Sequence, residues 1–175
     1  MKRDVLIVVD MQNDFIDGAL GSGEAVAIVE PVREKLAAFD GAVYFTRDTH
    51  EADYLDTQEG RKLPVPHCIR GTHGWEICDA LAPYAEKACV IDKPTFGSVT
   101  LASLLADELG EAMGSITLVG LCTDICVISN AMLLKAAFPE REIAVDAACC
   151  AGVTPESHQN ALNAMRMCQI TVENA

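Results

Sequence analysis

The sequence has few aromatic and few basic residues. Aromatic side chains make up 5% of the 175 residues, with a single tryptophan, and 13 lysines and arginines stand against 26 aspartates and glutamates. The formal net charge of −13 is unfavourable for binding a phosphate backbone. The acidic residues are spread along the chain, as on an ordinary solvated surface. We therefore expect no nucleic-acid partner.

Long apolar runs are also missing, although half of the residues are hydrophobic. No run has the length that a membrane-spanning helix needs. The N-terminal stretch MKRDVLIVVDMQ starts with basic residues, but its apolar run ends at Asp10. That run is too short for the apolar region and cleavage site of a signal peptide. We expect it to form a first strand, and we expect no membrane partner.

Cysteine, in contrast, is frequent. The chain has eight cysteines, and an even number can indicate a disulfide framework. A chain of this length and apolar content does not need disulfides for stability, and its start does not have the form of a secretion signal. We therefore predict a cytoplasmic protein with reduced thiols, most of them small core hydrophobes.

Strand-like apolar runs alternate with amphipathic segments along the chain. This alternation predicts an α/β fold, with a doubly wound, mostly parallel sheet of about six strands and helices on both faces. The length suits one domain, which we expect to span residues 1–175. The expected strands are residues 4–10, 41–48, 88–93, 115–121, 141–148 and 169–175. The expected helices are residues 24–39, 74–84, 98–109, 123–138 and 154–168.

Reactive polar residues follow four of these strands. Asp10 follows the first, Asp48 and His50 the second, Lys93 the third, and the segment GLCTDIC (120–126) the fourth. Ligands of doubly wound sheets bind outside the carboxyl ends of the strands. We therefore expect these residues to converge on one crevice.

Cys126 is the candidate nucleophile. It lies in the expected first turn of a helix, where unpaired N–H groups and the helix dipole favour a thiolate. We expect Lys93 to lower the pKa of the thiol further and Asp10 to carry its proton to a leaving group. Backbone N–H groups of the turn are available for an oxyanion. These residues predict a cysteine hydrolase; a buried core thiol is the alternative for Cys126 taken alone.

Cys122 differs from Cys126. The CxxxC spacing is not the redox-associated CxxC, and two thiols are too few for a structural zinc site. A disulfide between Cys122 and Cys126 requires a favourable turn geometry. We interpret Cys122 as a turn residue that contributes its backbone.

The long irregular stretch 47–74 contains three of the four histidines. Irregular segments of this length inside a compact domain are usually functional or disordered. Asp48 and His50 are alternate residues of an extended segment, so their side chains point the same way, and His67 can fold back towards them. Such a set suits one divalent ion, Zn²⁺ first, with Mn²⁺ or Fe²⁺ as alternatives.

Five motifs together carry a family resemblance. VVDMQNDF, RDTH, PHCIRGTHG, KPTFGS and GLCTDICV occur in this order in the nicotinamidase/isochorismatase-like cysteine hydrolases, and the resemblance covers nearly the whole chain. It implies a Rossmann-like α/β fold and a catalytic triad of Asp10, Lys93 and Cys126. It also implies a cis peptide between Leu121 and Cys122, with the N–H groups of Cys122 and Cys126 forming the oxyanion hole.

The nicotinamidase branch of this family implies more. Its metal ligands match Asp48, His50 and His67, and the ion coordinates the pyridine nitrogen of the substrate. Phe15 is then expected to form a wall of the substrate pocket, and Leu121 to contact the substrate. The resemblance thus predicts a metal-assisted nicotinamidase of pyridine nucleotide biosynthesis, which converts nicotinamide to nicotinate and ammonia through a thioester.

Two alternatives stay open. The substrate can be another small amide, a ureido or an N-carbamoyl compound. A non-catalytic thiol redox sensor is the other alternative, but it gives Asp10 and Lys93 no role. The resemblance also implies a homo-oligomer. One departure from the family is the stretch LPVPHC, which lacks an aromatic before the histidine. This leaves two alternatives: Tyr54 or Trp75 clamps the substrate ring instead, or the substrate is not a pyridine.

Overall fold

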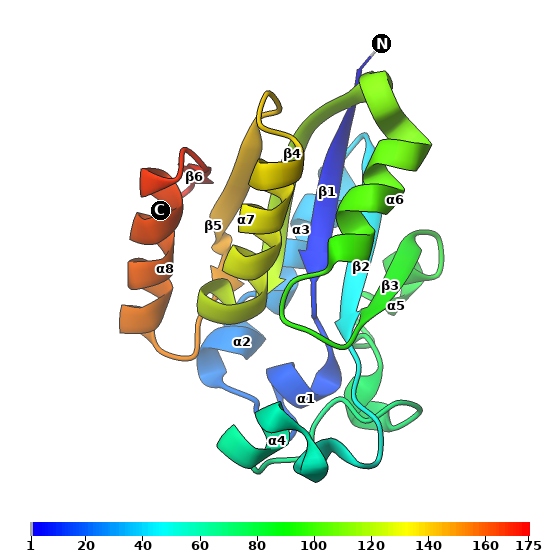
Figure 1. The fold of residues 1–175 in the computed structure, drawn as a ribbon, viewed down its shortest axis with the longest axis vertical. Helices are drawn as coiled ribbons and strands as arrows, with labels where there is room; N and C mark the ends of the chain where they lie inside the picture. Colours follow the sequence, from blue (N-terminus) through cyan, green and yellow to red (C-terminus); the bar gives the residue numbers. More distant parts are fainter. Residues whose placement is uncertain (1) are drawn as a thin grey trace.

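Six parallel strands form one open sheet at the centre of the protein (Figure 1). The structure is a computed structural model that describes residues 2–175. The strand order is β3-β2-β1-β4-β5-β6, and every neighbouring pair is parallel. The predicted doubly wound sheet is therefore confirmed. The strands are β1 (Arg3–Val9), β2 (Ala42–Asp48), β3 (Cys89–Lys93), β4 (Met113–Leu121), β5 (Ile143–Ala151) and β6 (Thr171–Glu173).

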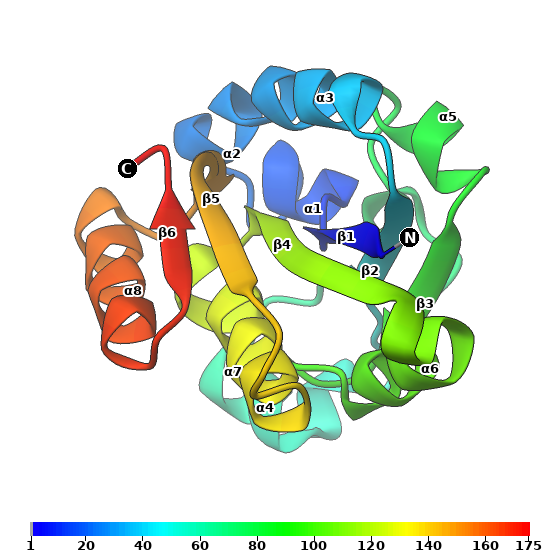
Figure 2. The ribbon, with the colours of Figure 1, turned by 90° about the horizontal axis from the view of Figure 1, so that it is seen from above.

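Helices cover both faces of the sheet, as Figure 2 shows. On one face lie α2 (Gly23–Ala27), α3 (Val29–Ala38) and α5 (Ala82–Ala85), and on the other lie α6 (Val99–Leu109), α7 (Ile128–Ala137) and α8 (Pro155–Met167). Two short helices, α1 (Asn13–Ile16) and α4 (Gln58–Lys62), lie beyond the carboxyl ends of the strands (Figure 1). The remaining turns are 3₁₀ segments η1 (Tyr54–Asp56), η2 (His73–Trp75) and η3 (Gly110–Ala112), and the π-helical turn η4 (Thr123–Val127).

The central strand β1 is buried on both sides. Val5, Ile7 and Val9 belong to the core under α6, α7 and α8, whereas Leu6 and Val8 belong to the core under α2, α3 and α5. A parallel strand covered on both faces requires such a continuous apolar run. Asp10, the residue after DVLIVV, therefore lies at the carboxyl end of a strand that is packed on both faces.

Two expected helices differ from the structure. The segment 24–39 forms α2 and α3 with a break at Ile28, which ends α2 and precedes α3. The segment 74–84 is irregular except for η2 and the four-residue α5. The Gln12 side chain donates to the Trp75 carbonyl and the Asn13 N–H donates to the Glu76 carbonyl, while the Met11 carbonyl accepts from the Cys78 N–H. The backbone of this segment therefore hydrogen-bonds with residues that follow β1 instead of forming a longer helix.

Within residues 2–175, no helix combines the length and the apolar character needed to cross a bilayer.

Candidate functional site

The carboxyl ends of β1, β2, β3 and β4 bring the predicted residues together. Asp48 and Lys93 are paired across β2 and β3. Val9, just before Asp10, is paired with both Thr46 of β2 and Gly120 of β4. Parallel register thus places residues from four distant parts of the sequence at one edge of the sheet, as the strand-end argument predicts.

Lys93 lies at the centre of this group. Its Nζ is 2.6 Å from Asp10 Oδ2, 3.5 Å from Cys126 Sγ and 3.4 Å from Asp48 Oδ1. Lys93 is 1% exposed and Asp10 is fully buried. A buried ammonium needs compensating charge, which Asp10 and Asp48 supply. The structure therefore places Asp10 and Cys126 in contact with the same Lys93 ammonium.

The two carboxylate oxygens of Asp10 have different partners. Its Oδ1 accepts a hydrogen bond from Thr46 Oγ1 (2.7 Å). Its Oδ2 is ion-paired with Lys93 but accepts no hydrogen bond of favourable angle within residues 2–175. Burial raises the pKa of Asp10, and the Lys93 charge opposes that rise. A carboxylate with a raised pKa and an available lone pair is suited to act as a general base.

The thiol of Cys126 does not match one expectation. Burial raises the pKa of Cys126 well above its ordinary value, Asp10 raises it further, and Lys93 only partly opposes them. The expected lowering of this pKa by Lys93 is therefore outweighed by desolvation.

The turn that carries Cys126 has the geometry that the resemblance implied. The peptide between Leu121 and Cys122 is cis, and the π-helical turn η4 continues directly into α7. Asn130, fully buried on α7, donates from Nδ2 to the Cys126 carbonyl (2.8 Å) and accepts at Oδ1 from the Ser98 N–H (2.9 Å). Asn130 is not among the residues predicted from the sequence, although a polar residue on an apolar helix four positions after Cys126 is a usable signal.

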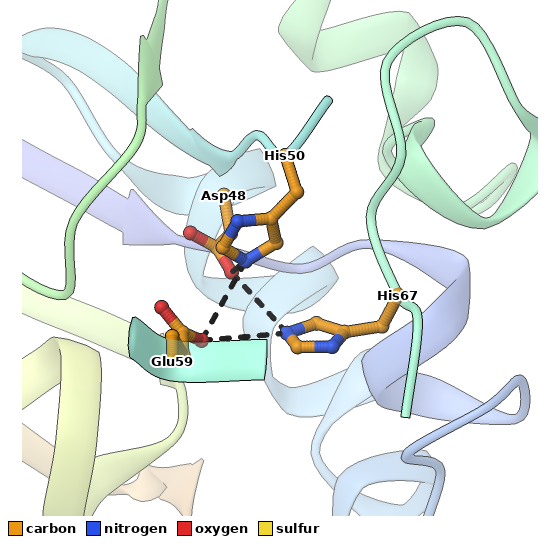
Figure 3. A group of neighbouring side chains, drawn as sticks. All are labelled: Asp48, His50, Glu59 and His67. Atoms are coloured by element: carbon orange, nitrogen blue, oxygen red, sulfur yellow. Dashed lines mark hydrogen bonds and ion pairs between the residues drawn. The ribbon is translucent and has the colours of Figure 1, made fainter. Parts of the chain in front are cut away.

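A second cluster lies beside the first (Figure 3). Asp48, His50 and His67, all buried, converge with Glu59 so that one ligand atom from each lies within 4.8 Å of the others. Asp48 Oδ2 is 3.1 Å from His50 Nε2 and 3.7 Å from His67 Nε2, and Glu59 Oε1 is 3.6 Å and 3.9 Å from the same nitrogens. His67 thus folds back as predicted.

Glu59 is the one member of this cluster that is not predicted from the sequence. It lies on α4, inside the stretch expected to be irregular. The helix packs against η1 so closely that a Cβ added at Gly60 would lie 2.0 Å from the Tyr54 carbonyl oxygen. Thr57 caps α4 by accepting from the Gly60 N–H. The T-x-x-G pattern of this cap is a weak local signal for the turn that presents Glu59.

Neighbouring groups hold these side chains in place. His67 Nδ1 is 2.8 Å from the Val65 carbonyl, which directs Nε2 into the cluster. Gln12, fully buried, accepts from the Asp48 N–H and donates to the Asp48 and Trp75 carbonyls. Asp14 accepts from the Cys68 N–H (2.7 Å). Such supporting contacts are typical of metal ligands.

The cluster fits a divalent transition metal ion. Two imidazoles and two carboxylates are the donors that Zn²⁺, Mn²⁺ and Fe²⁺ accept. Burial alone raises the pKa of Asp48, but hydrogen bonds with His50 and His67 and the Lys93 charge lower it below its usual range. An ionised Asp48 beside two imidazoles provides the negative charge that a cation requires.

One pocket connects the two clusters. It has a volume of about 680 Å³ and reaches from Asp48, Glu59 and His67 to Cys126. Phe15 and Leu121 line it, and the Phe15 ring lies 5.5 Å from the His67 ring. Tyr54 and Trp75 do not line it: Tyr54 packs behind His50 and His67, and Trp75 stacks under Arg47. The prediction that one of them clamps the substrate is therefore not supported.

Nearly the whole chain matches one known protein family. The family described as "Isochorismatase domain" matches residues 4–175. The chain belongs to the isochorismatase family. As a family member it resembles the nicotinamidase of Schizosaccharomyces pombe, with 28% identity over 95% of this chain and 91% of the relative.

Solved structures of similar proteins agree with the fold. A pyrazinamidase of Pyrococcus horikoshii in complex with zinc has 26% identity and a TM-score of 0.80 over 97% of this chain and 98% of its own. An N-carbamoylsarcosine amidase of Thermoplasma acidophilum has 28% identity and a TM-score of 0.79 over 99% and 96%. These relatives are amidases by name, in agreement with the predicted hydrolase class.

Proposed function

We propose that this isochorismatase-family protein is a metal-assisted cysteine amidohydrolase that converts nicotinamide to nicotinate and ammonia. The proposal rests on the position of Lys93, whose Nζ contacts Asp10, Cys126 and Asp48. Two of these partners, Cys126 and Asp48, line the same pocket. The proposed nucleophile and the candidate metal-binding cluster would therefore act on the same substrate molecule.

The proposed reaction begins at Cys126. Its sulfur attacks the carboxamide carbon while Asp10 Oδ2 accepts the thiol proton. The Cys122 and Cys126 N–H groups stabilise the oxyanion. Asp10 then returns the proton to the leaving nitrogen, and ammonia departs from a thioester on Cys126. Asp10 next takes a proton from water, whose oxygen attacks the thioester, and the acid leaves as the thiol is restored.

Lys93 balances the charges during these steps. Burial lowers the pKa of a lysine, but Asp10, Cys126 and Asp48 together raise the pKa of Lys93 above its usual range. The ammonium therefore persists while negative charge moves between Asp10 and Cys126. A fixed charge in a buried site stabilises such transfers without reorganisation of solvent.

Asp48, His50, Glu59 and His67 are the residues that would hold the metal ion. When bound, the ion would supply a Lewis-acid contact to a ring nitrogen. Phe15, beside His67, would then lie against the ring, and Leu121 would contact the carboxamide end next to Cys126.

The direct test is ammonia release from nicotinamide by the purified protein. We expect Cys126→Ala to lose at least about a thousandfold in kcat, because it removes the nucleophile. Cys168→Ala is the matched control, since Cys168 is exposed at the end of α8. Near-normal turnover by Cys126→Ala would exclude the mechanism.

A second candidate within this class is hydrolysis of an N-carbamoyl or ureido compound. The likeness to the N-carbamoylsarcosine amidase is as high as that to the nicotinamidase in identity. Lys62 lines the pocket and offers a cation for a substrate carboxylate. A panel of nicotinamide, pyrazinamide, a ureido acid and an N-carbamoyl amino acid separates the two; the higher kcat/KM identifies the substrate class.

The redox-sensor alternative agrees less well with the geometry. Sensor thiols are exposed and have a low pKa, whereas Cys126 is 4% exposed and burial raises its pKa. None of the eight cysteines, all within the described residues, forms a disulfide. We further propose that the protein acts in the cytoplasm, in pyridine nucleotide biosynthesis, as a homo-oligomer of one domain spanning residues 1–175.

A further inference from the structure

We infer that His158 is a positioning residue that fixes the turn of the nucleophile through a hydrogen bond with Thr123. Thr123 is the first residue of η4 and is fully buried. Its Oγ1 lies 2.7 Å from Nδ1 of His158 on α8. No other side-chain hydrogen bond of Thr123 exists within residues 2–175. This inference rests on the proposed role of Cys126, three residues further along the same turn.

The contact is part of a wider link between η4 and the start of α8. A Cβ added at Gly152 would lie 2.9 Å from the backbone nitrogen and Cα of His158, so α8 is seated directly on the end of β5. Asp124, next to Thr123, accepts from the Val153 N–H at 3.1 Å and 3.3 Å. Gly152 and Val153 also line the substrate pocket. The two hydrogen bonds therefore join the Cys126 turn to a wall of that pocket.

The direction of the hydrogen bond depends on the charge of His158. A neutral ring can accept at Nδ1 from the Thr123 hydroxyl, whereas a protonated ring has donors at both nitrogens. In the protonated state the buried hydroxyl must accept instead, and its own hydrogen has no partner. Burial lowers the pKa of His158, and Asp124 on η4, the one charged group that acts on it within the described residues, opposes that shift. The neutral ring is therefore the form that supports the turn.

Three substitutions test the contact. His158→Leu removes the acceptor, Thr123→Val removes the hydroxyl but keeps the shape, and His158→Asn keeps an acceptor that does not titrate. We expect His158→Leu and Thr123→Val to lower kcat about tenfold with little change in KM, since small misplacements of reacting groups are costly. The double variant is expected to lose no more than either single variant, because both remove the same interaction.

His158→Asn is the decisive variant. We expect it to restore most of kcat and to remove the part of the acid-side decline in kcat that His158 protonation causes. Gln159→Leu, at an exposed neighbouring position of α8, is the control for a general effect on the helix. Thermal unfolding of every variant separates loss of fold from loss of positioning.

A readout without substrate keeps this inference separate from the proposed function. The rate at which iodoacetamide alkylates Cys126, located by peptide mass spectrometry, is expected to change in His158→Leu and Thr123→Val but not in His158→Asn. If the protein hydrolyses no amide and this pattern still appears, the proposed function is wrong and the positioning role stands. Unchanged kcat and alkylation in His158→Leu, or equal impairment of His158→Asn and His158→Leu, would overturn it.

Discussion

At the scale of single residues, Asp10 shows how neighbours set the properties of one carboxyl group. Its backbone has a φ of 49°, in the left-handed region that aspartate tolerates better than most residues. Its Oδ1 accepts a hydrogen bond from Thr46, and its Oδ2 is ion-paired with Lys93. Burial alone would favour the neutral acid, and these two partners keep the ionised form available.

Thr46 therefore offers a way to tune the proposed base. Its hydrogen bond lowers the pKa of Asp10 against the effect of burial. Thr46→Val removes that donor, so the pKa of Asp10 rises further. Because the base must be deprotonated, the acid limb of the pH profile of kcat/KM is expected to move to higher pH. A limb that stays in place, with kcat/KM measured across the acid range, would show that another group controls it.

Glu59 gives a test of the metal cluster. Glu59→Gln replaces an anionic donor by a neutral one, and we expect the affinity for Zn²⁺ to fall at least about tenfold. Calorimetric titration of metal-free protein measures this without any substrate. Glu76→Gln is the matched control, because Glu76 is exposed in the same part of the chain. Equal affinity of the two variants would exclude Glu59 as a ligand.

At the scale of elements, α7 is more than a cover for the sheet. Asn130 joins it to the start of α6 and to η4 by hydrogen bonds to Ser98, Phe96 and Cys126 backbone groups. All three partners belong to segments that surround the pocket. The helix therefore holds the loop after β3 and the turn after β4 at a fixed separation.

Asn130→Ala is expected to destabilise the protein by about 2 kcal/mol or more, because buried backbone groups lose their partners. We also expect kcat to fall, since the Cys126 carbonyl is released. Urea unfolding monitored by circular dichroism measures the first effect. Asn163→Ala on the exposed side of α8 is the control; similar midpoints for both variants would contradict the role of Asn130.

Most of the strands and several site residues can be predicted from the sequence. The strands are predicted within a few residues because their apolar runs are set by two-sided burial. Asp10, Asp48 and Lys93 meet as expected because parallel strands end at one edge. The place of Glu59 depends on how α4 packs against Tyr54, and the irregular path of 74–84 depends on hydrogen bonds with residues 11–13. Neither dependence leaves a periodic pattern in the sequence.

At the scale of the whole molecule, one ion pair joins distant parts of the chain. Lys35 of α3 lies 2.5 Å from Asp146 of β5, and Asp146 also accepts from Asn174 near the end of the chain (3.0 Å). The Asp146 side chain is 4% exposed. This contact closes the helix layer over the far half of the sheet, away from the pocket.

Acid is expected to weaken this contact. Burial raises the pKa of Asp146, but Lys35 and Asn174 lower it below its ordinary value overall. A lowered pKa in the folded state gives stability that is present above the ordinary pKa and is lost as the pH falls through the folded value. Asp146→Asn is therefore expected to cost about 1–2 kcal/mol at neutral pH, with a smaller cost below about pH 4.

Denaturant midpoints across this range, with exposed Asp40→Asn as control, measure the difference. A cost of Asp146→Asn that does not shrink in acid would show that shape, and not charge, governs the contact.

Lys93 has a consequence for how the two halves of the pocket communicate. Its ammonium contacts both Cys126 and Asp48, so a cation bound at Asp48 would change the electrostatic environment of Cys126 through Lys93. Coupling between two binding events is reciprocal by thermodynamic necessity. If a bound ion changes the affinity of the Cys126 subsite for a ligand by some factor, that ligand changes the affinity for the ion by the same factor. The buried Lys93 side chain would therefore couple binding at one subsite to binding at the other.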